Sequence, residues 1–176
     1  ILLNSPEFLL KKTAAYDAAH PIMNIVGLTV DDAKHQEAAK KVHAILPNVP
    51  YISTMSSDEA ELIKYAHNVH GYLRVVYSNL LYDLSEKMGM NWENVSSALK
   101  VDPMMSPWYL DPIHKSGRGA GGVCFIKDYE AFLQFYKNVG DKKGDKVFEA
   151  IREKNIELLK STQKDLDVLK SVYGEI

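Results

Sequence analysis

Apolar residues recur every three or four positions across residues 56–89, which is the period of one face of an α-helix. Ser56 and Glu59 have the spacing of a capping box, which satisfies backbone donors at a helix start. Gly89 suits a left-handed cap at the other end. The pattern therefore predicts one unbroken helix over residues 56–89. Its apolar positions extend beyond one narrow stripe, so we expect cover on a second side.

Residues before this helix contain three short apolar runs that predict strands. An amphipathic segment between the last two runs predicts a helix that Asp31 or Asp32 caps. The strands are expected at residues 1–3, 22–28 and 51–54, and the helix up to Leu46. A strand–helix–strand order is typical of the edge of an α/β layer.

Residues after Gly89 are predicted to be helical on both sides of one long loop. The helices are expected at residues 91–100, 126–139 and 142–172, and the loop at residues 102–122. The predicted fold class is thus mainly α with a short α/β portion at the N-terminus, built around a long central helix.

Composition excludes several classes of function. Twenty-one Lys and Arg against 23 Asp and Glu give a net charge of −2, which offers no electrostatic argument for nucleic acid or an anionic membrane. No apolar run approaches the roughly 20 residues of a membrane span. A single cysteine excludes an internal disulfide and predicts a reducing, cytoplasmic location. The chain begins without methionine, on an apolar tripeptide, as a piece of a longer protein would.

The long loop contains the first candidate for chemistry. A loop of about 20 residues inside a compact domain is uncommon unless it has a function. The only cysteine, Cys124, follows a glycine cluster that would let the backbone approach a ligand: Gly117, Gly119, Gly121 and Gly122. Its place near a helix start favours a thiolate, while the alternative is a small buried apolar side chain.

Two polar residues of the long helix form the second candidate. Lys64 and Asn68 are four residues apart and share one face. They are either a solvated stripe or a cation and an amide directed at a reacting oxygen. His67 and His70 also share a face, but no third ligand is placed by the sequence, so we predict no metal site.

Three segments together resemble the UDP-glucose/GDP-mannose dehydrogenase family. Residues 119–128 (GAGGVCFIKD) resemble its G-[FY]-G-G-x-C-F-x-K-D signature, residues 61–68 (ELIKYAHN) its E-L-x-K-x-x-x-N helix start, and residues 4–9 (NSPEFL) its N-P-E-F-L loop. The resemblance implies that residues 1–55 end an N-terminal Rossmann-like domain. Residues 56–176 would form the helical central domain, similar to that of 6-phosphogluconate dehydrogenase.

The family oxidises the primary alcohol of a nucleotide sugar to a carboxylate through two hydride transfers to NAD and a cysteine thioester. By resemblance, Cys124 is the nucleophile, and Lys64 and Asn68 stabilise the oxyanion. Asp128 would orient a water or Lys64, and Glu7 would be the base that assists hydrolysis.

The resemblance also implies residues that bind substrate and cofactor. The nucleotide-sugar site would be lined by Phe8, Leu9, Tyr109, Leu110, Gly121 and Gly122. Lys127 would contact NAD, whose site lies mostly outside this chain because no G-x-G-x-x-G motif follows a strand. UDP-glucose is the expected substrate, and a homodimer through residues 56–89 is the expected assembly.

The chain departs from the family pattern at residues that bear on the choice of sugar. Lys11 replaces a second glutamate, Met104 an arginine, and Ala120 an aromatic residue. Two alternatives stay open. One is a β-hydroxyacid dehydrogenase of the 6-phosphogluconate type, which needs no cysteine. The other is a non-catalytic dimerisation module without a cofactor domain.

Overall fold

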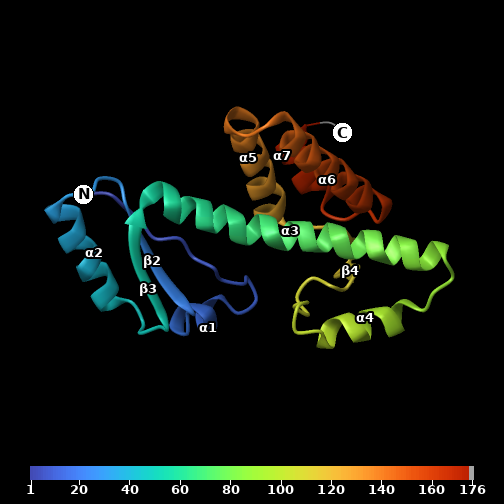
Figure 1. Ribbon diagram of the computed structural model, residues 1–176, viewed down its shortest axis with the longest axis horizontal. Helices are drawn as coiled ribbons and strands as arrows, with labels where there is room; N and C mark the ends of the chain where they lie inside the picture. Colours follow the sequence, from blue (N-terminus) through green and yellow to red (C-terminus); the bar gives the residue numbers. More distant parts are fainter. Residues whose placement is uncertain (175–176) are drawn as a thin grey trace. The chain divides into compact units, whose positions relative to one another are not determined.

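The computed structural model describes residues 1–174, which fall into two compact units. The first unit is Ile1–His67, and the second begins at Asn68. The boundary lies inside the longest helix, so this helix contributes residues to both units (Figure 1). The domain boundary at residue 55 stays a prediction.

The first unit is built on a three-stranded sheet of order β1-β2-β3, with β1 at Leu3–Asn4, β2 at Met23–Leu28 and β3 at Tyr51–Ser56. β1 pairs antiparallel with β2, and β2 pairs parallel with β3, with Met23 opposite Tyr51. Helix α2 (Ala33–Ile45) makes the crossover between the parallel strands, and Asp32 caps it. Its residue Ala39 packs against Val26 and Leu28 of β2. The predicted strand–helix–strand order is therefore confirmed.

The long helix α3 (Ser57–Lys87) begins and ends as its sequence predicts. The Ser56 backbone N–H donates to Glu59 Oε2 over 2.8 Å, and the Glu59 N–H donates to Ser56 Oγ over 3.2 Å, which is a complete capping box. At the other end Gly89 has φ 66°, and the Met90 N–H donates to the Ser85 carbonyl over 2.9 Å. This is the Schellman arrangement that a left-handed glycine permits.

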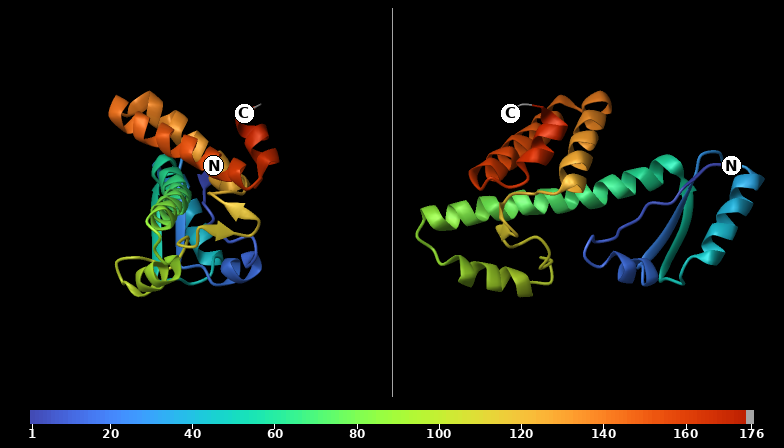
Figure 2. Two further views of the ribbon diagram at one scale, coloured as in Figure 1. Left: turned by 90° about the vertical axis from the view of Figure 1, so that its right-hand side faces the viewer. Right: turned by 180° about the vertical axis from the view of Figure 1, so that it is seen from behind.

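The rest of the second unit packs around α3. It contains α4 (Trp92–Val101), the short hairpin β4–β5 (Ile113–His114, Gly117–Arg118), α5 (Val123–Val139), α6 (Lys142–Ser161) and α7 (Leu166–Tyr173). Figures 1 and 2 show α5, α6 and α7 on one side of α3, and α4 with the hairpin on the other. The fold class, mainly helical with a small α/β portion, is as predicted.

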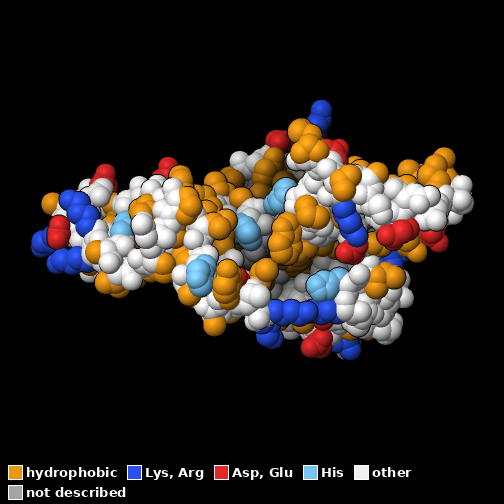
Figure 3. Space-filling model, turned by 90° about the horizontal axis from the view of Figure 1, so that it is seen from below, with side chains coloured by type: hydrophobic (Ala, Val, Ile, Leu, Met, Phe, Trp, Pro, Cys, Tyr) orange, Lys and Arg blue, Asp and Glu red, His pale blue; other side chains and the backbone are white. Residues whose placement is uncertain are grey.

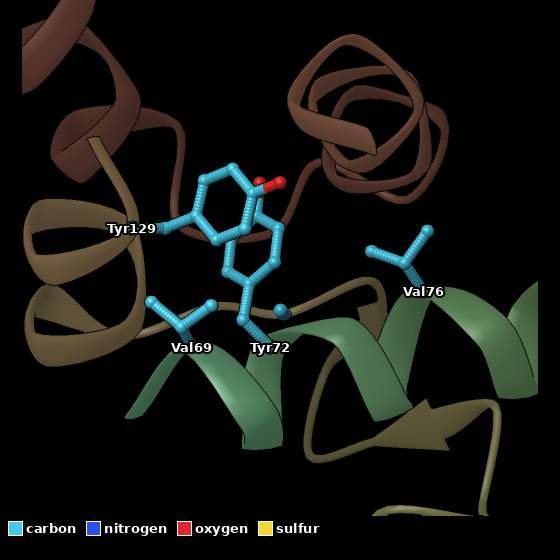
Figure 4. Close-up of a cluster of buried hydrophobic side chains, with 5 residues drawn as sticks. Val69, Tyr72, Val76 and Tyr129 are labelled. Carbon is cyan, nitrogen blue, oxygen red and sulfur yellow. The ribbon is translucent and has the colours of Figure 1, made fainter. Parts of the chain in front are cut away.

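The core of the second unit forms where α5 meets α3. Val69, Tyr72 and Val76 of α3 are buried together with Tyr129 of α5 and with Ala120 (Figure 4). The rings of Tyr72 and Tyr129 stack with centroids 3.8 Å apart and planes at 15°. Burial of two large rings in one stack makes this contact the main apolar link between the two helices.

Some element predictions were wrong. The loop predicted over residues 102–122 contains the β4–β5 hairpin, and α1 (Ala14–Ala19) lies in a segment for which no element was predicted. Helix α5 begins three residues earlier than predicted, so Cys124 lies inside its first turn. The single helix predicted over residues 142–172 is two helices, because Gln163 (φ 57°) and Asp165 (φ 51°) are left-handed and interrupt it.

The exposed surface includes a row of apolar side chains on α3. Tyr77, Leu80 and Leu84 of α3, together with Met88 directly after the helix, are 47–59% exposed and recur at helical spacing. Figure 3 shows apolar side chains reaching the surface at many points on one face. Among residues 1–174, no helix has both the length and the apolar character needed to cross a membrane.

Candidate active site

A buried hydrogen bond joins α3 to the first turns of α5. Asn68 Nδ2 donates to Asp128 Oδ2, and the two residues are 7% and 5% exposed. The other carboxylate oxygen, Asp128 Oδ1, accepts from Lys127 Nζ, and the Lys127 side chain is 60% exposed. Two of the predicted site residues, 60 positions apart in sequence, are therefore in direct contact.

Cys124 is the second residue of α5, and its side chain is exposed. Asp128 follows four residues later, so the two side chains lie one turn apart on the same face of the helix. Cys124 is an exposed residue of α5, and Asp128, which accepts from Asn68 of α3, lies one turn further along the helix. The predicted alternative, a small buried apolar side chain at Cys124, is wrong because the residue is exposed.

The glycine cluster before Cys124 packs mainly against the protein itself. At Gly117, Gly119 and Gly121 an added Cβ would overlap or press on side chains of α6 and of the residues that follow it. At Gly122, which has φ 83°, an added Cβ would meet no atom within 4 Å. Of these four glycines, only Gly122 leaves the open space that the approach of a ligand would need.

The loop before the hairpin is anchored on α3 through backbone carbonyls. Arg74 Nε donates to the Trp108 carbonyl over 3.1 Å, and Arg74 also donates to the Ser106 carbonyl. Ser78 Oγ donates to the carbonyl of Leu110, which is 1% exposed. The side chain of Leu110 is thus a core residue of the second unit.

Tyr109 lies in this anchored loop with φ 66°, an uncommon backbone conformation for an aromatic residue. Its ring contacts the ring of Phe125 edge-on, with centroids 5.4 Å apart, and partial burial raises the pKa of the Tyr109 hydroxyl. Gly71 makes room for the contact, because a Cβ there would overlap Phe125. Tyr109 therefore packs against the residue that follows Cys124.

In the first unit, Glu7 and Lys64 form an ion pair. Lys64 Nζ lies 3.0 Å from Glu7 Oε1 and also donates to the Glu7 carbonyl. The Leu9 backbone N–H donates to Glu7 Oε2 over 2.7 Å. This backbone bond and then the bond from Lys64 lower the pKa of the Glu7 carboxyl, against the opposing effect of desolvation. The carboxylate and ammonium predicted for the site are therefore in contact in the first unit.

Aromatic groups surround this ion pair. The Lys64 ammonium lies 5.5 Å from the centre of the Phe8 ring, and the Phe8 ring contacts the His67 ring edge-on at 5.2 Å. Leu9 is 37% exposed. Within the part of the chain that the structure describes, no group of three His, Cys, Asp or Glu side chains is placed to hold a metal ion.

Sequence reasoning missed the residues that hold the glycine cluster. Asn155 of α6 and the residues Thr162, Lys164 and Asp165 after it all bond to the backbone of residues 117–122. The burial of Asn155 and of Lys164, which is 6% exposed, would indicate this role, but burial is visible only in the structure. The many charged residues between Lys142 and Lys170 are typical of a solvated helix face, which is the interpretation that the sequence alone favours.

The chain matches known proteins over this region. Residues 58–157, more than half of the chain, match the UDP-glucose/GDP-mannose dehydrogenase family, central domain. The chain is 30% identical over 176 residues to the UDP-glucose 6-dehydrogenase TuaD of Bacillus subtilis, a match that covers 98% of this chain and 36% of that protein. It is 30% identical over 135 residues to a UDP-glucose 6-dehydrogenase of Rickettsia conorii, covering 77% of this chain and 30% of that protein.

Solved structures agree with these matches. A UDP-glucose dehydrogenase from Pyrobaculum islandicum superposes with a TM-score of 0.70 at 28% identity, covering 86% of this chain and 33% of that one. A UDP-D-ManNAc dehydrogenase from Pyrococcus horikoshii, at 19% identity, superposes with a TM-score of 0.72 over 90% of this chain and 34% of that one and shares the fold. The chain thus spans about a third of the length of its relatives. It belongs to the UDP-glucose/GDP-mannose dehydrogenase family, whose central domain it contains.

Proposed function

We propose that this chain is the central catalytic part of a dehydrogenase that oxidises the primary alcohol of a nucleotide sugar, UDP-glucose or a close relative, to a carboxylate. The observation that carries the proposal is the exposed Cys124 thiol, one helical turn before the buried Asn68–Asp128 pair. Membership of the family and the names of the relatives support the same substrate class.

Cys124 acts on the aldehyde stage of this reaction. Its thiolate attacks the aldehyde carbon, a C–S bond forms, and the carbonyl electron pair moves to oxygen. The adduct is a thiohemiacetal, and NAD, which the family implies and which residues outside this chain would hold, would supply the hydride acceptor that its oxidation to the thioester requires. Water then attacks the resulting thioester carbonyl, the C–S bond breaks, and the sulfur leaves as the thiolate while the sugar is released as a carboxylate.

Residues of α3 and α5 stabilise the charge that develops on oxygen. Lys64 and Asn68, one turn apart on α3, supply a cation and an amide donor for the oxyanion. Asp128 orients Asn68 through their hydrogen bond and accepts from Lys127, which would contact the cofactor. Preorganised donors of this kind cost no reorganisation at the moment of reaction.

Substrate binding and the hydrolysis step involve the remaining predicted residues. Glu7, whose pKa the Leu9 backbone bond and the Lys64 contact lower, is a carboxylate at neutral pH and would accept a proton from the attacking water. The nucleotide sugar would contact Phe8, Leu9, Tyr109 and the backbone around Leu110, Gly121 and Gly122. Gly122 has more open space around its Cα than Gly121, which lies against Asp165 and Lys164.

The described residues do not fit the phosphate site of NAD. A dinucleotide pyrophosphate binds free N–H groups at a helix N-terminus that follows a strand. At α2 this position is capped by the Asp32 carboxylate, and at α3 by Ser56 with Glu59. Carboxylates at both helix starts would repel the pyrophosphate, so we derive no step from a cofactor bound to this chain.

The test is Cys124→Ser in the protein that carries this chain, incubated with UDP-glucose and NAD. We expect the variant to lose conversion to the uronic acid while keeping its far-UV circular dichroism. In the unmodified protein, iodoacetamide at neutral pH should label Cys124, and labelling should abolish acid formation. Full conversion to uronic acid by the serine variant would refute the role of Cys124 and favour a single-oxidation dehydrogenase of the 6-phosphogluconate type.

We also propose that the protein is a homodimer in which α3 contributes to the interface. The row of Tyr77, Leu80, Leu84 and Met88 leaves about half of each side chain in water. A contiguous apolar row of this kind is typical of a surface that a partner covers. Packing against a second copy of α3 across a two-fold axis would bury this row in both subunits.

A further inference from the structure

The backbone that leads into α5 is held by side chains of α6 and of the α6–α7 junction, which we define as residues 162–165. The backbone N–H of Ala120 donates to Asn155 Oδ1 over 2.6 Å, and Asn155 Nδ2 donates back to the Ala120 carbonyl over 3.0 Å. Two positions earlier, the Arg118 N–H donates to Thr162 Oγ1 over 3.0 Å. The side chains of Asn155 and Thr162 thus bond to backbone groups of Arg118 and Ala120, as the backbone of a neighbouring strand would do in a sheet.

Two charged residues of the junction complete the contacts. Lys164 Nζ donates to the carbonyls of Gly119 over 2.8 Å and Gly117 over 3.3 Å. The backbone N–H of Gly122, which is the N-cap residue of α5, donates to Asp165 Oδ2 over 2.8 Å. Every residue from 117 to 122 except Gly121 is therefore bonded to α6 or the junction, and Gly121 lies against the Asp165 carboxylate.

Lys164 is a buried charged residue whose ammonium group bonds to the glycine segment. It is 6% exposed, and burial lowers the pKa of its ammonium group. A charged group that leaves water must be compensated by hydrogen bonds, and here the two glycine carbonyls supply them. Gln163 and Asp165, on either side, hold left-handed backbone conformations that turn the chain so that Lys164 and Asp165 face the glycine segment.

Asp165 bonds to Gly122, the glycine of the 117–122 segment that lies nearest to Cys124 in sequence. Gly122 has φ 83° and no atom within 4 Å of where a Cβ would lie, so side-chain packing does not set its conformation. The hydrogen bond to Asp165 does set it, and Cys124 follows two residues later. Loss of this bond would release the start of α5 while the Asn155 and Lys164 contacts keep the core closed.

We propose that the α6–α7 junction positions Cys124, with Asp165 as the positioning residue that fixes the N-cap of α5 and thereby the direction of the thiol. This inference rests on the proposed role of Cys124 as nucleophile.

The test compares Asp165→Gly, Asp165→Asn and Asp167→Ala in the protein that carries this chain. Glycine removes the carboxylate and tolerates the left-handed conformation of residue 165, so the backbone is not strained. We expect Asp165→Gly to lower kcat for uronic acid formation by roughly tenfold or more with KM for UDP-glucose unchanged, because misplacement of a reacting group affects the chemical step.

Asparagine should restore kcat, because its amide oxygen can accept the Gly122 N–H and it tolerates the same backbone conformation. Asp167, exposed on α7 two residues away, is the matched control, and its replacement should leave kcat unchanged. The rate of Cys124 alkylation by iodoacetamide, measured in the same variants, should change in Asp165→Gly and return to the original value in Asp165→Asn.

Unchanged kcat and alkylation rate in folded Asp165→Gly would overturn the inference, and so would equal losses in Asp165→Gly and Asp165→Asn. The proposed function fails separately, if Cys124→Ser still forms uronic acid. The alkylation rates would then still report whether Asp165 positions the thiol.

Discussion

Replacement of Arg118 by methionine is expected to destabilise the second unit. Arg118 Nε donates to Asn79 Oδ1 over 2.8 Å, and its Nη2 atom contacts Asp83 Oδ1 at 2.6 Å and the Asn79 carbonyl at 3.3 Å. Its guanidinium also lies 5.2 Å from the centre of the Tyr82 ring. This one side chain therefore joins the β4–β5 hairpin to one face of α3.

The magnitude follows from burial. Asn79 is 0% exposed, so loss of the donor leaves a buried amide oxygen without its partner, at a cost of about 1–3 kcal/mol. The Asp83 side chain is 26% exposed and keeps Lys154 at 3.5 Å, so the lost ion pair adds about 1 kcal/mol or less. We expect Arg118→Met to lower the free energy of unfolding by about 1–4 kcal/mol in total.

The assay is urea unfolding followed by hydrogen exchange and mass spectrometry, in which peptides from α3 and the hairpin report on this unit. Lys137→Met is the control, because its ion pair with Glu149 lies in water and should contribute far less. Asn79→Leu combined with Arg118→Met should recover part of the loss, since neither buried partner is then left unpaired. A loss for Arg118→Met no larger than that of the control would refute the reasoning.

Two further predictions concern assembly and pH. Leu80→Asp should dissociate the dimer, because burial of one leucine contributes roughly 1.5–3 kcal/mol and the two-fold symmetry places one such leucine in each copy. Val147→Asp, at 56% exposure on α6, is the control. A light-scattering mass that shows a monomer for the unmodified protein would contradict the prediction. Glu7 titrates below 4.5 in the folded state, so its stabilising contribution is present above pH 4.5 and lost as pH falls through the lower folded pKa. NMR titration should show that Lys64→Met raises the Glu7 pKa only part of the way to 4.5, because the Leu9 N–H bond has the larger effect. A full return of the Glu7 pKa to 4.5 would show instead that Lys64 dominates.

The sequence could predict those features that neighbouring residues determine. The capping box of Ser56 and Glu59 and the left-handed Gly89 depend on residues within one turn, and both are present as expected. Local chemistry of this kind is visible in a short window of sequence. The sequence placed Cys124 only near a helix start, and its position on one face of α5 with Asp128 follows from the earlier start of that helix in the structure.

Features that depend on distant residues could not be predicted. The break after α6 contains neither Gly nor Pro, and it exists because Lys164 reaches carbonyls 45 and 47 residues earlier in the chain. Likewise, no pattern indicates that Asn68 pairs with Asp128, or that three of the four glycines permit the close approach of α6 and of the α6–α7 junction. In these places tertiary contacts override the weak conformational preferences of the local sequence.

The three-stranded sheet of the first unit has a consequence for handling the polypeptide. Strand β3 pairs only with β2 among the described residues, so the N–H and C=O groups along its outer side are available to other strands. Tyr51 and Ile52, at 53% and 50% exposure, add apolar surface to this edge. An uncovered edge with exposed apolar side chains is a template for intermolecular β-pairing. Preparations in which this edge is bare should therefore be prone to aggregate through the sheet, by a route independent of α3.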